Sequence, residues 1–287
     1  MGFSLFGTFI PYYGFFIVIG IGCAFLLGCA LCKKRSLSTD DFILLDEYLV
    51  AFGFLGAKAL YIIVSFPATD FSRVFQSIAQ FNAFVSSGFV FYGGLLGGLA
   101  AFPVVKKVHR VDTRAYMPLL APCLCLAHAF GRIGCSLAGC CHGKVTAGAL
   151  YFLYRHSLVA PNNVRLFPVQ GIESLCLFVL CSVLIVLAMH SSGRTVIAVY
   201  ITAYSALRFI LEFFRGDAER GMVGFLSTSQ IISVLLFAGI CVLWLLRRMS
   251  ASNLQGQKSS APAKGGFFRP HRENSHLHDF PRFRNID

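Results

Sequence analysis

The sequence predicts an all-α, polytopic integral membrane protein with seven transmembrane helices, its N-terminus outside and its C-terminus inside. Of the 287 residues, 56% are hydrophobic and only 13% are charged, whereas a soluble domain typically carries about 25% charged residues. The apolar residues also gather into segments close to the roughly 20 residues that a helix needs to cross a bilayer. Finally, Lys and Arg cluster at alternate ends of these segments, as the positive-inside rule requires.

The predicted spans are 9–32, 42–66, 84–105, 115–135, 172–190, 195–214 and 225–246. The second contains Asp46, Glu47 and Lys58, which we expect to face the interior of the bundle. The first ends in Lys33-Lys34-Arg35 and lacks a preceding basic segment, so it predicts a membrane helix rather than a cleaved signal peptide.

Two regions differ in composition. Residues 1–249 are predicted to form the membrane domain, and residues 250–287 a basic, disordered cytoplasmic tail rich in Ser, Gln, Gly, Lys, Pro and His. The formal net charge of +12 does not indicate a nucleic-acid partner, because the basic residues mostly flank apolar segments. There they fix topology and meet anionic lipid headgroups, so membrane lipid is the expected partner.

The stretch from His128 to Gly143 carries an arginine into the end of the fourth span. Arginine is costly in hydrocarbon and marks a partner or a function when it occurs there. Gly131 and Gly134 flank Arg132 and leave room for a backbone or a ligand to approach. This stretch therefore predicts the floor of an active site.

The sixth span carries a polar stripe. Tyr200, Tyr204, Arg208, Glu212 and Arg215 follow one another at helical spacing and so share one face. The stripe could be an ion pair that only locks helix packing, or a cationic site in which Glu212 holds guanidinium groups for a phosphate. A phosphodiester suits these arginines better than a proton path, which would need several intramembrane carboxylates or histidines.

The third span contains two overlapping small-xxx-small pairs, Gly93/Gly97 and Gly94/Gly98. Such pairs allow two helices to pack closely. Tyr92, directly before them, could instead expose its hydroxyl group to a cavity.

Cys135, Cys140, Cys141 and His142 form a C-x4-C-C-H cluster. This order does not reproduce a common zinc-site pattern, so we expect no metal and interpret the thiols as small buried side chains. A catalytic or redox thiol stays open as an alternative.

Taken in order, these motifs resemble those of the bacterial prolipoprotein diacylglyceryl transferases over roughly residues 9–246. The matching segments are Pro11-Tyr12-Tyr13-Gly14, Gly56-Ala57-Lys58-Ala59-Leu60-Tyr61, Phe91-Tyr92-Gly93-Gly94-Leu95, Gly131-Arg132-Ile133-Gly134, Pro168-Val169-Gln170-Gly171-Ile172-Glu173, Arg208 to Arg215, and Gln230.

The resemblance implies an enzyme of the bacterial cytoplasmic (inner) membrane that needs no cofactor. It would transfer diacylglyceryl from phosphatidylglycerol to the lipobox cysteine thiol of a prolipoprotein signal peptide, releasing glycerol phosphate. The expected catalytic residues are Arg132, Arg208 and Tyr92. The expected substrate-binding residues are Glu212, Arg215, Gln170, Glu173, Tyr13, Lys58, Gly131, Gly134, Gly93 and Gly94.

The sequence departs from the family pattern after Arg132. The family signature continues Gly-Asn-x-x-Asn-x-Glu-x-x-Gly, where this chain has Cys135, Ala138, Cys140 and Gly143. The frequent third-span His is Tyr92. Two other functions therefore stay open: a non-enzymatic phospholipid-binding or transport protein, and a thiol-dependent membrane enzyme that acts through Cys135 and Cys140.

Overall fold

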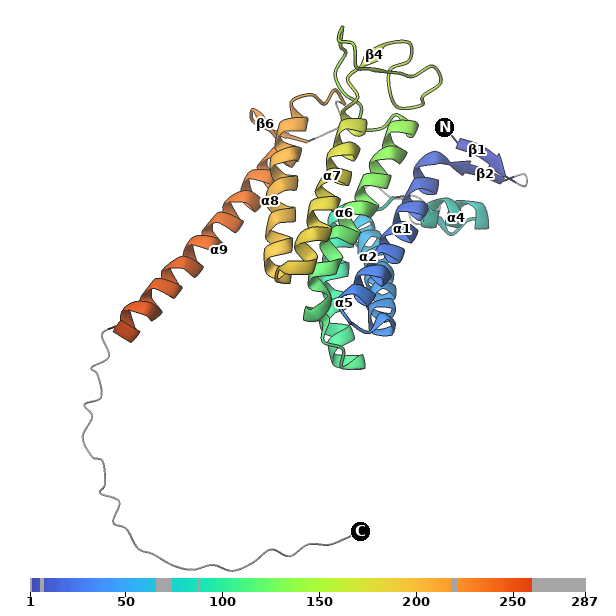
Figure 1. The fold of residues 1–287 in the computed structure, drawn as a ribbon. Helices are drawn as coiled ribbons and strands as arrows, with labels where there is room; N and C mark the ends of the chain where they lie inside the picture. Colours follow the sequence, from blue (N-terminus) through green and yellow to red (C-terminus); the bar gives the residue numbers. More distant parts are fainter. Residues whose placement is uncertain (1, 6–7, 66–73, 87, 218–220, 260–287) are drawn as a thin grey trace, which may run out of the picture. The chain divides into compact units, whose positions relative to one another are not determined.

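A computed structural model describes residues 2–5, 8–65, 74–86, 88–217 and 221–259 (Figure 1). In these residues the chain is helical apart from short two-stranded sheets. The chain divides into two compact units, Met1–Val242 and Leu243–Asp287. All contacts considered below lie within the first unit.

The helices confirm the predicted all-α membrane protein. They are α1 (Tyr12–Lys34), α2 (Thr39–Ser65), α4 (Ile78–Ser86), α5 (Phe91–His109), α6 (Thr113–Ala138), α7 (Val169–His190), α8 (Gly193–Glu212) and α9 (Thr228–Ser259). Within the described residues, six of them are long and apolar enough to cross a membrane, namely α1, α2, α6, α7, α8 and the first part of α9. The chain is thus a multi-pass membrane protein.

Each sheet is an antiparallel hairpin. The strands are β1 (Gly2–Leu5) with β2 (Thr8–Pro11), β3 (Phe152–Leu153) with β4 (Arg165–Leu166), and β5 (Met222–Val223) with β6 (Leu226–Ser227). The β1–β2 hairpin precedes α1, β3–β4 connects α6 to α7, and β5–β6 connects α8 to α9. Because α6, α7 and α8 pack side by side and alternate in direction, these last two connections lie at the same end of the helices (Figure 1).

One predicted span is wrong. The third predicted span, 84–105, is broken: α4 ends at Ser86 and α5 begins at Phe91. Gly88 between them has φ +69°, a left-handed conformation that a helix does not contain and that glycine adopts without strain. At the other end of the chain, α9 continues to Ser259, past the predicted domain boundary at residue 249. The remainder of the predicted tail, 260–287, lies outside the described residues.

The core forms where α1, α2, α6, α7 and α8 meet. Phe42, Leu45, Leu119, Leu177 and Leu184 are fully buried there. Many other Leu, Val and Phe side chains on the same helices are exposed. An apolar outer surface is what the lipid-facing side of a membrane helix requires.

Glycine contacts hold α5 against α2. A Cβ atom at Gly93 would collide with the carbonyl oxygen of Gly56, and one at Gly97 with the carbonyl oxygen of Phe52. Both obstacles are backbone atoms of α2, which cannot rotate away. The small-xxx-small pair Gly93/Gly97 is therefore a helix-packing feature.

We expect Gly97→Ala to lower the free energy of unfolding by about 1–3 kcal/mol, the usual cost of overpacking. The matched control is Gly22→Ala on α1, where an added Cβ meets nothing within 4 Å. That change should be neutral or stabilise by up to about 1 kcal/mol, because Ala favours helix over Gly. Thermal unfolding of both variants in detergent checks the difference, and equal effects would contradict the packing role.

Candidate functional site

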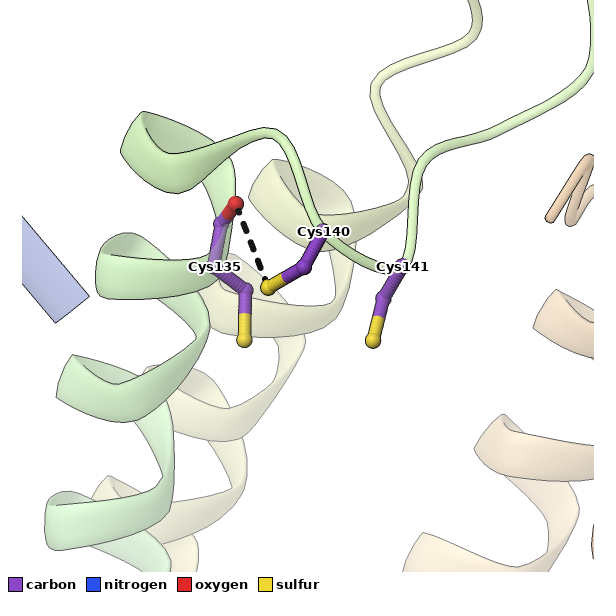
Figure 2. A group of neighbouring side chains, drawn as sticks. All are labelled: Cys135, Cys140 and Cys141. Carbon is purple, nitrogen blue, oxygen red and sulfur yellow. Dashed lines mark hydrogen bonds between the residues drawn. The ribbon is translucent and has the colours of Figure 1, made fainter. Parts of the chain in front are cut away.

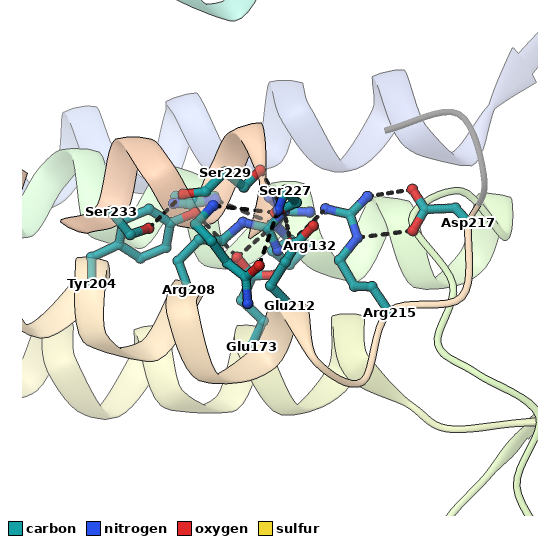
Figure 3. Close-up of polar contacts among 12 residues, drawn as sticks. Arg132, Glu173, Tyr204, Arg208, Glu212, Arg215, Asp217, Ser227, Ser229 and Ser233 are labelled. Carbon is teal, nitrogen blue, oxygen red and sulfur yellow. Dashed lines mark hydrogen bonds and ion pairs between the residues drawn. The ribbon is translucent and has the colours of Figure 1, made fainter. Parts of the chain in front are cut away.

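Glu173 joins three helices at the end where the hairpin connections lie. Its Oε1 is 3.2 Å from Nε of Arg132 on α6, and it accepts a hydrogen bond of 3.2 Å from the hydroxyl group of Tyr204 on α8. Glu173 itself belongs to the first turns of α7 and is 1% exposed. This buried carboxylate fixes the position of Arg132 (Figure 3).

His128 lies one helical turn before Arg132 and contacts both of its neighbours. Nε2 of His128 is 3.3 Å from Nε of Arg132, which donates to it. The imidazole ring also packs edge-on against Tyr204, with 5.0 Å between ring centroids. A ring nitrogen that accepts requires a neutral imidazole with its proton on Nδ1. Sequence reasoning did not select His128, although its four-residue spacing from Arg132 was a usable signal.

The polar stripe of α8 forms the second half of the site. Nη2 of Arg208 lies 2.8 Å from Oε2 of Glu212, and Nη1 of Arg215 lies 3.8 Å from the same oxygen. Arg208 also donates to Oγ of Ser229 in the first turn of α9, at 3.3 Å. The three charged side chains are all buried. Arg208 and Glu212 share one face of α8 as predicted, and Arg215, three residues past the end of that helix, still reaches the same carboxylate.

One guanidinium nitrogen of this group has no hydrogen-bond partner within the described part of the chain. It is Nη1 of Arg208, which is buried. A buried donor left unpaired costs about 1–3 kcal/mol, and more where the group is charged. Such a donor fits an anionic oxygen, because a charge-assisted hydrogen bond would offset that cost.

Arg215, just beyond α8, is held by a second carboxylate. Its Nε donates to Oδ1 of Asp217 at 2.9 Å, and its Nη2 donates to Oδ2. Burial alone would raise the pKa of Asp217, but these hydrogen bonds and the charge of Arg215 lower that pKa below its ordinary value of 3.8. Burial likewise disfavours the charged form of Arg215. The hydrogen bonds and the charge of Asp217 outweigh this effect of burial, so the pKa of Arg215 is raised.

This pairing predicts a pH-dependent contribution to stability. Because the pKa of Asp217 is lower in the folded chain than in the unfolded chain, its stabilising effect is present above about pH 4 and is lost as the pH falls through the folded pKa. We expect Asp217→Asn to lower the free energy of unfolding by about 1.5–3 kcal/mol at neutral pH. Thermal unfolding across a pH series checks this: the wild type and the variant should converge at acidic pH. A difference that persists there would contradict the pairing.

The segment after α6 pairs with the segment after α8. Gly143 and Arg215 form an antiparallel bridge, and the backbone N–H of Lys144 donates to the carbonyl of Phe214 at 2.8 Å. Gln170 adds a link from α7, since its Nε2 donates to the carbonyl of Cys140 at 2.8 Å. The two connections are therefore tied together beside the ion pairs.

Residues of α1 and α6 flank the site. Gly134 lets α1 approach, because a Cβ atom there would lie 3.2 Å from Tyr13 and Phe16, whereas one at Gly131 would meet nothing within 4 Å. The side chain of Tyr13 is half exposed. Beside these residues is a mostly apolar cavity of about 540 Å³, lined by α1, α6, the first turns of α7 and the β3 strand.

The other predicted site residues belong to the α2–α5 pair. Nζ of Lys58 donates to the carbonyl of Phe84 and lies 4.3 Å from the centroid of that ring and 4.8 Å from the centroid of Tyr61. Tyr92, at the start of α5, is about half exposed. Gly93 packs against α2, and a Cβ atom at its neighbour Gly94 would lie 3.3 Å from the carbonyl oxygen of Gly53. The ion-pair groups above are instead carried by α6, α7, α8 and the start of α9.

The three cysteines of the C-x4-C-C-H cluster come together at the end of α6 (Figure 2). The Sγ atoms of Cys135, Cys140 and Cys141 all lie within 4.8 Å of one another. The pKa of Cys141 is lowered by its contacts with the side chains of Cys135 and Cys140 and by the guanidinium groups of Arg215 and Arg132, whereas the pKa of Cys140 is raised.

These features define a multi-pass membrane protein with buried guanidinium–carboxylate pairs at one end of its helices. Comparison with known proteins agrees with the motifs. The family model for prolipoprotein diacylglyceryl transferase matches residues 1–246. The chain belongs to this family, which confirms the resemblance seen in the sequence.

Several relatives carry a more specific name. The chain is 34% identical over 257 residues to phosphatidylglycerol–prolipoprotein diacylglyceryl transferase 2 of Clostridium perfringens, covering 89% of this chain and 98% of the relative. It is 37% identical over 234 residues to the corresponding transferase of Clostridium tetani, covering 81% and 91%. For that of Lactococcus lactis subsp. lactis the identity is 31% over 249 residues, covering 84% and 91%.

Proposed function

We propose that this chain transfers the diacylglyceryl group of phosphatidylglycerol to the lipobox cysteine thiol of a prolipoprotein and releases glycerol phosphate. Membership of the family and the names of the relatives support this activity. The observation that carries it in the site is the buried Arg208, which is held by Glu212 and has one nitrogen with no partner among the residues that the structure describes. That nitrogen suits an anionic oxygen.

The chemistry explains why such a donor is needed. The substrate sulfur forms a bond to the glyceryl carbon, the bond from that carbon to the phosphate oxygen breaks, and the thiol proton ends on the departing glycerol phosphate. Negative charge therefore grows on the departing phosphate oxygen in the transition state. Preorganised donors placed at that oxygen lower the barrier, and they act more strongly in a buried site.

Arg208 and Arg132 have separate roles in binding the phosphate. Arg208 donates from Nη1 to the phosphate, and Arg132 donates from its terminal nitrogens while Glu173 and His128 hold its Nε. Glu212 positions Arg208 and Arg215 together, because both contact the same carboxylate oxygen. Gln170 positions the connection after α6 through Cys140.

The apolar parts of the substrates need separate surfaces. The mostly apolar cavity of about 540 Å³, lined among others by Tyr12, Ile133 and Leu137, suits an acyl chain. Tyr92 and Lys58, on the α2–α5 pair, are placed to contact substrate from the other helices. Gly93, Gly94 and Gly134 stay in the proposal as substrate-binding positions, and each also lies close to a neighbouring helix.

The proposed setting is the bacterial cytoplasmic membrane. In this proposal α5 crosses the membrane in addition to the six long apolar helices, which makes seven spans, and the N-terminus lies outside and the C-terminus inside. The basic last turns of α1 and α5 support this topology, since both contain Lys pairs at the end opposite the site. The site then opens on the outer side, where it would meet the lipobox cysteine of an exported precursor. The distribution of basic residues gives no reason to expect a nucleic-acid partner.

The test combines the purified full-length chain, vesicles that contain phosphatidylglycerol, and a lipobox peptide. Mass spectrometry should detect the thioether-linked diacylglyceryl peptide, and a peptide with Ser in place of the lipobox Cys should stay unmodified. A correctly inserted chain that binds the lipid but yields no product would overturn the proposal in favour of a lipid-binding protein. Loss of activity in C135S/C140S with no change in lipid binding would favour a thiol-dependent enzyme.

A further inference from the structure

We propose that Cys135, Cys140 and Cys141 form a three-thiolate site for a soft divalent cation of the Zn²⁺ class. Their Sγ atoms lie within 4.8 Å of one another. Because Zn–S bonds are about 2.3 Å long, thiolates that share one ion lie roughly 4 Å apart. The three sulfur atoms are therefore close to the spacing of a shared ligand set before any ion is added.

The backbone conformation after α6 brings the three cysteines together. Helix α6 ends at Ala138, and Gly139, at φ +79°, turns the chain back while its N–H donates to the carbonyl of Cys135. Cys141 has φ +56°, which is uncommon for a residue with a side chain and carries strain. The result brings the sulfur of Cys141 to the same space as the other two (Figure 2). A packing role for small side chains gives no reason for that strain.

Other cysteines of the chain show what a packing role looks like. Cys125 and Cys181 are buried singly, and each thiol donates to a backbone carbonyl, of Leu177 at 3.2 Å and of Pro122 at 3.4 Å. Cys140 of the cluster also donates to a backbone carbonyl, that of Cys135 at 3.9 Å, so this bond alone does not distinguish the two groups. The cluster differs in number and in access, because Cys140 and Cys141 are only half buried and leave a path for an ion.

The sequence pattern did not predict this site because adjacent ligands such as Cys140 and Cys141 are unusual. The Cys135–Cys140 pair alone has a four-residue gap, which falls within the range found in zinc sites. The geometry of the turn supports the site, because it brings the sulfur of Cys141 to those of Cys135 and Cys140. Thiolates select soft cations such as Zn²⁺ over Mg²⁺ or Ca²⁺.

An ion at this position would brace the connection after α6. Gln170 donates to the carbonyl of Cys140, and the N–H of Gly216 donates to the carbonyl of His142 at 3.0 Å. The first link reaches the start of α7, and the second reaches the connection after α8. Cation binding would thus restrict the backbone that carries Arg215 and Gln170, whatever the reaction is.

The experiment uses the full-length protein, reduced and freed of metal, in detergent. Titration with Cd²⁺, a spectroscopic probe for thiolate sites, should give ultraviolet thiolate charge-transfer absorption that saturates at one ion per chain, and Zn²⁺ should compete it away. The triple variant C135S/C140S/C141S should lose this signal. The matched variant C23S/C176S/C241S, changed at three cysteines outside the cluster, should keep it.

A second measurement does not depend on the stability of a variant. In the wild type, Zn²⁺ should protect Cys135, Cys140 and Cys141 from maleimide labelling while the labelling of Cys241 stays unchanged. Labelling that is the same with and without Zn²⁺ would overturn the site, as would equal Cd²⁺ binding by the cluster variant. A disulfide between two of the three, found in protein isolated without reductant, would assign the cluster to redox chemistry instead.

Discussion

Arg208→Ala is expected to lower the rate of diacylglyceryl transfer by about 10²–10³-fold, the usual effect of removing one preorganised donor from an anionic transition state. The reason is that Arg208 offers a buried nitrogen with no partner among the described residues, while Glu212 and Ser229 hold the rest of the guanidinium in place. The measurement is the initial rate of lipobox-peptide modification in vesicles that contain phosphatidylglycerol. The rate is normalised to the amount of inserted protein.

Two variants make this result specific. Arg208→Lys keeps the charge but not the planar set of donors, so its rate should fall between those of the wild type and the Ala variant. Arg194→Ala removes an exposed arginine at the opposite end of the same helix and should leave the rate within about twofold of the wild type. A near-normal rate for Arg208→Ala would show that this guanidinium does not meet the reacting phosphate.

The stripe on α8 was predictable because it depends only on helical period. Arg208 and Glu212 are one turn apart, and any helix over these residues puts them on one face. Arg215 lies beyond the end of α8 and is placed by its bridge to Gly143. The contacts between helices were not predictable in this way. Glu173 meets Arg132 and Tyr204 only because α6, α7 and α8 pack at one particular register, and a single sequence does not contain that register. The motif therefore predicted Glu173 as a substrate-binding residue without identifying its partners.

The errors have a similar physical origin. Residues 84–105 are apolar enough to be read as one span, and the break at Gly88 depends on a backbone angle that composition does not reveal. Gly93 fits both a packing and a ligand-approach role until the carbonyl of Gly56 is found against it. Likewise the grouping of Cys141 with Cys135 and Cys140 follows from the turn at Gly139. Patterns with a fixed period were reliable, while features that depend on a turn or a neighbouring helix were not.

Glu173→Ala is expected to destabilise the fold by about 3–5 kcal/mol, because it leaves the guanidinium of Arg132 without its counter-charge. Arg132 is mostly buried and has its ion pair with Glu173 at 3.2 Å. Tyr204 loses its acceptor in the same variant. Thermal and denaturant unfolding in detergent should show the loss, and transfer activity should fall with it because Arg132 is no longer held toward the phosphate.

The double variant R132A/E173A separates stability from chemistry. Removing both charges leaves no uncompensated ion, so the double variant should recover much of the stability lost in Glu173→Ala. Its transfer activity should stay low, because the proposed donor is absent. Glu47 on α2 was predicted to face the interior of the bundle, but that prediction is wrong because its side chain is exposed. Glu47→Ala therefore serves as the control with little effect on either property. If the double variant regains activity together with stability, then Arg132 acts only in the packing of α6 against α7, and the phosphate contact must come from Arg208 and Arg215 alone.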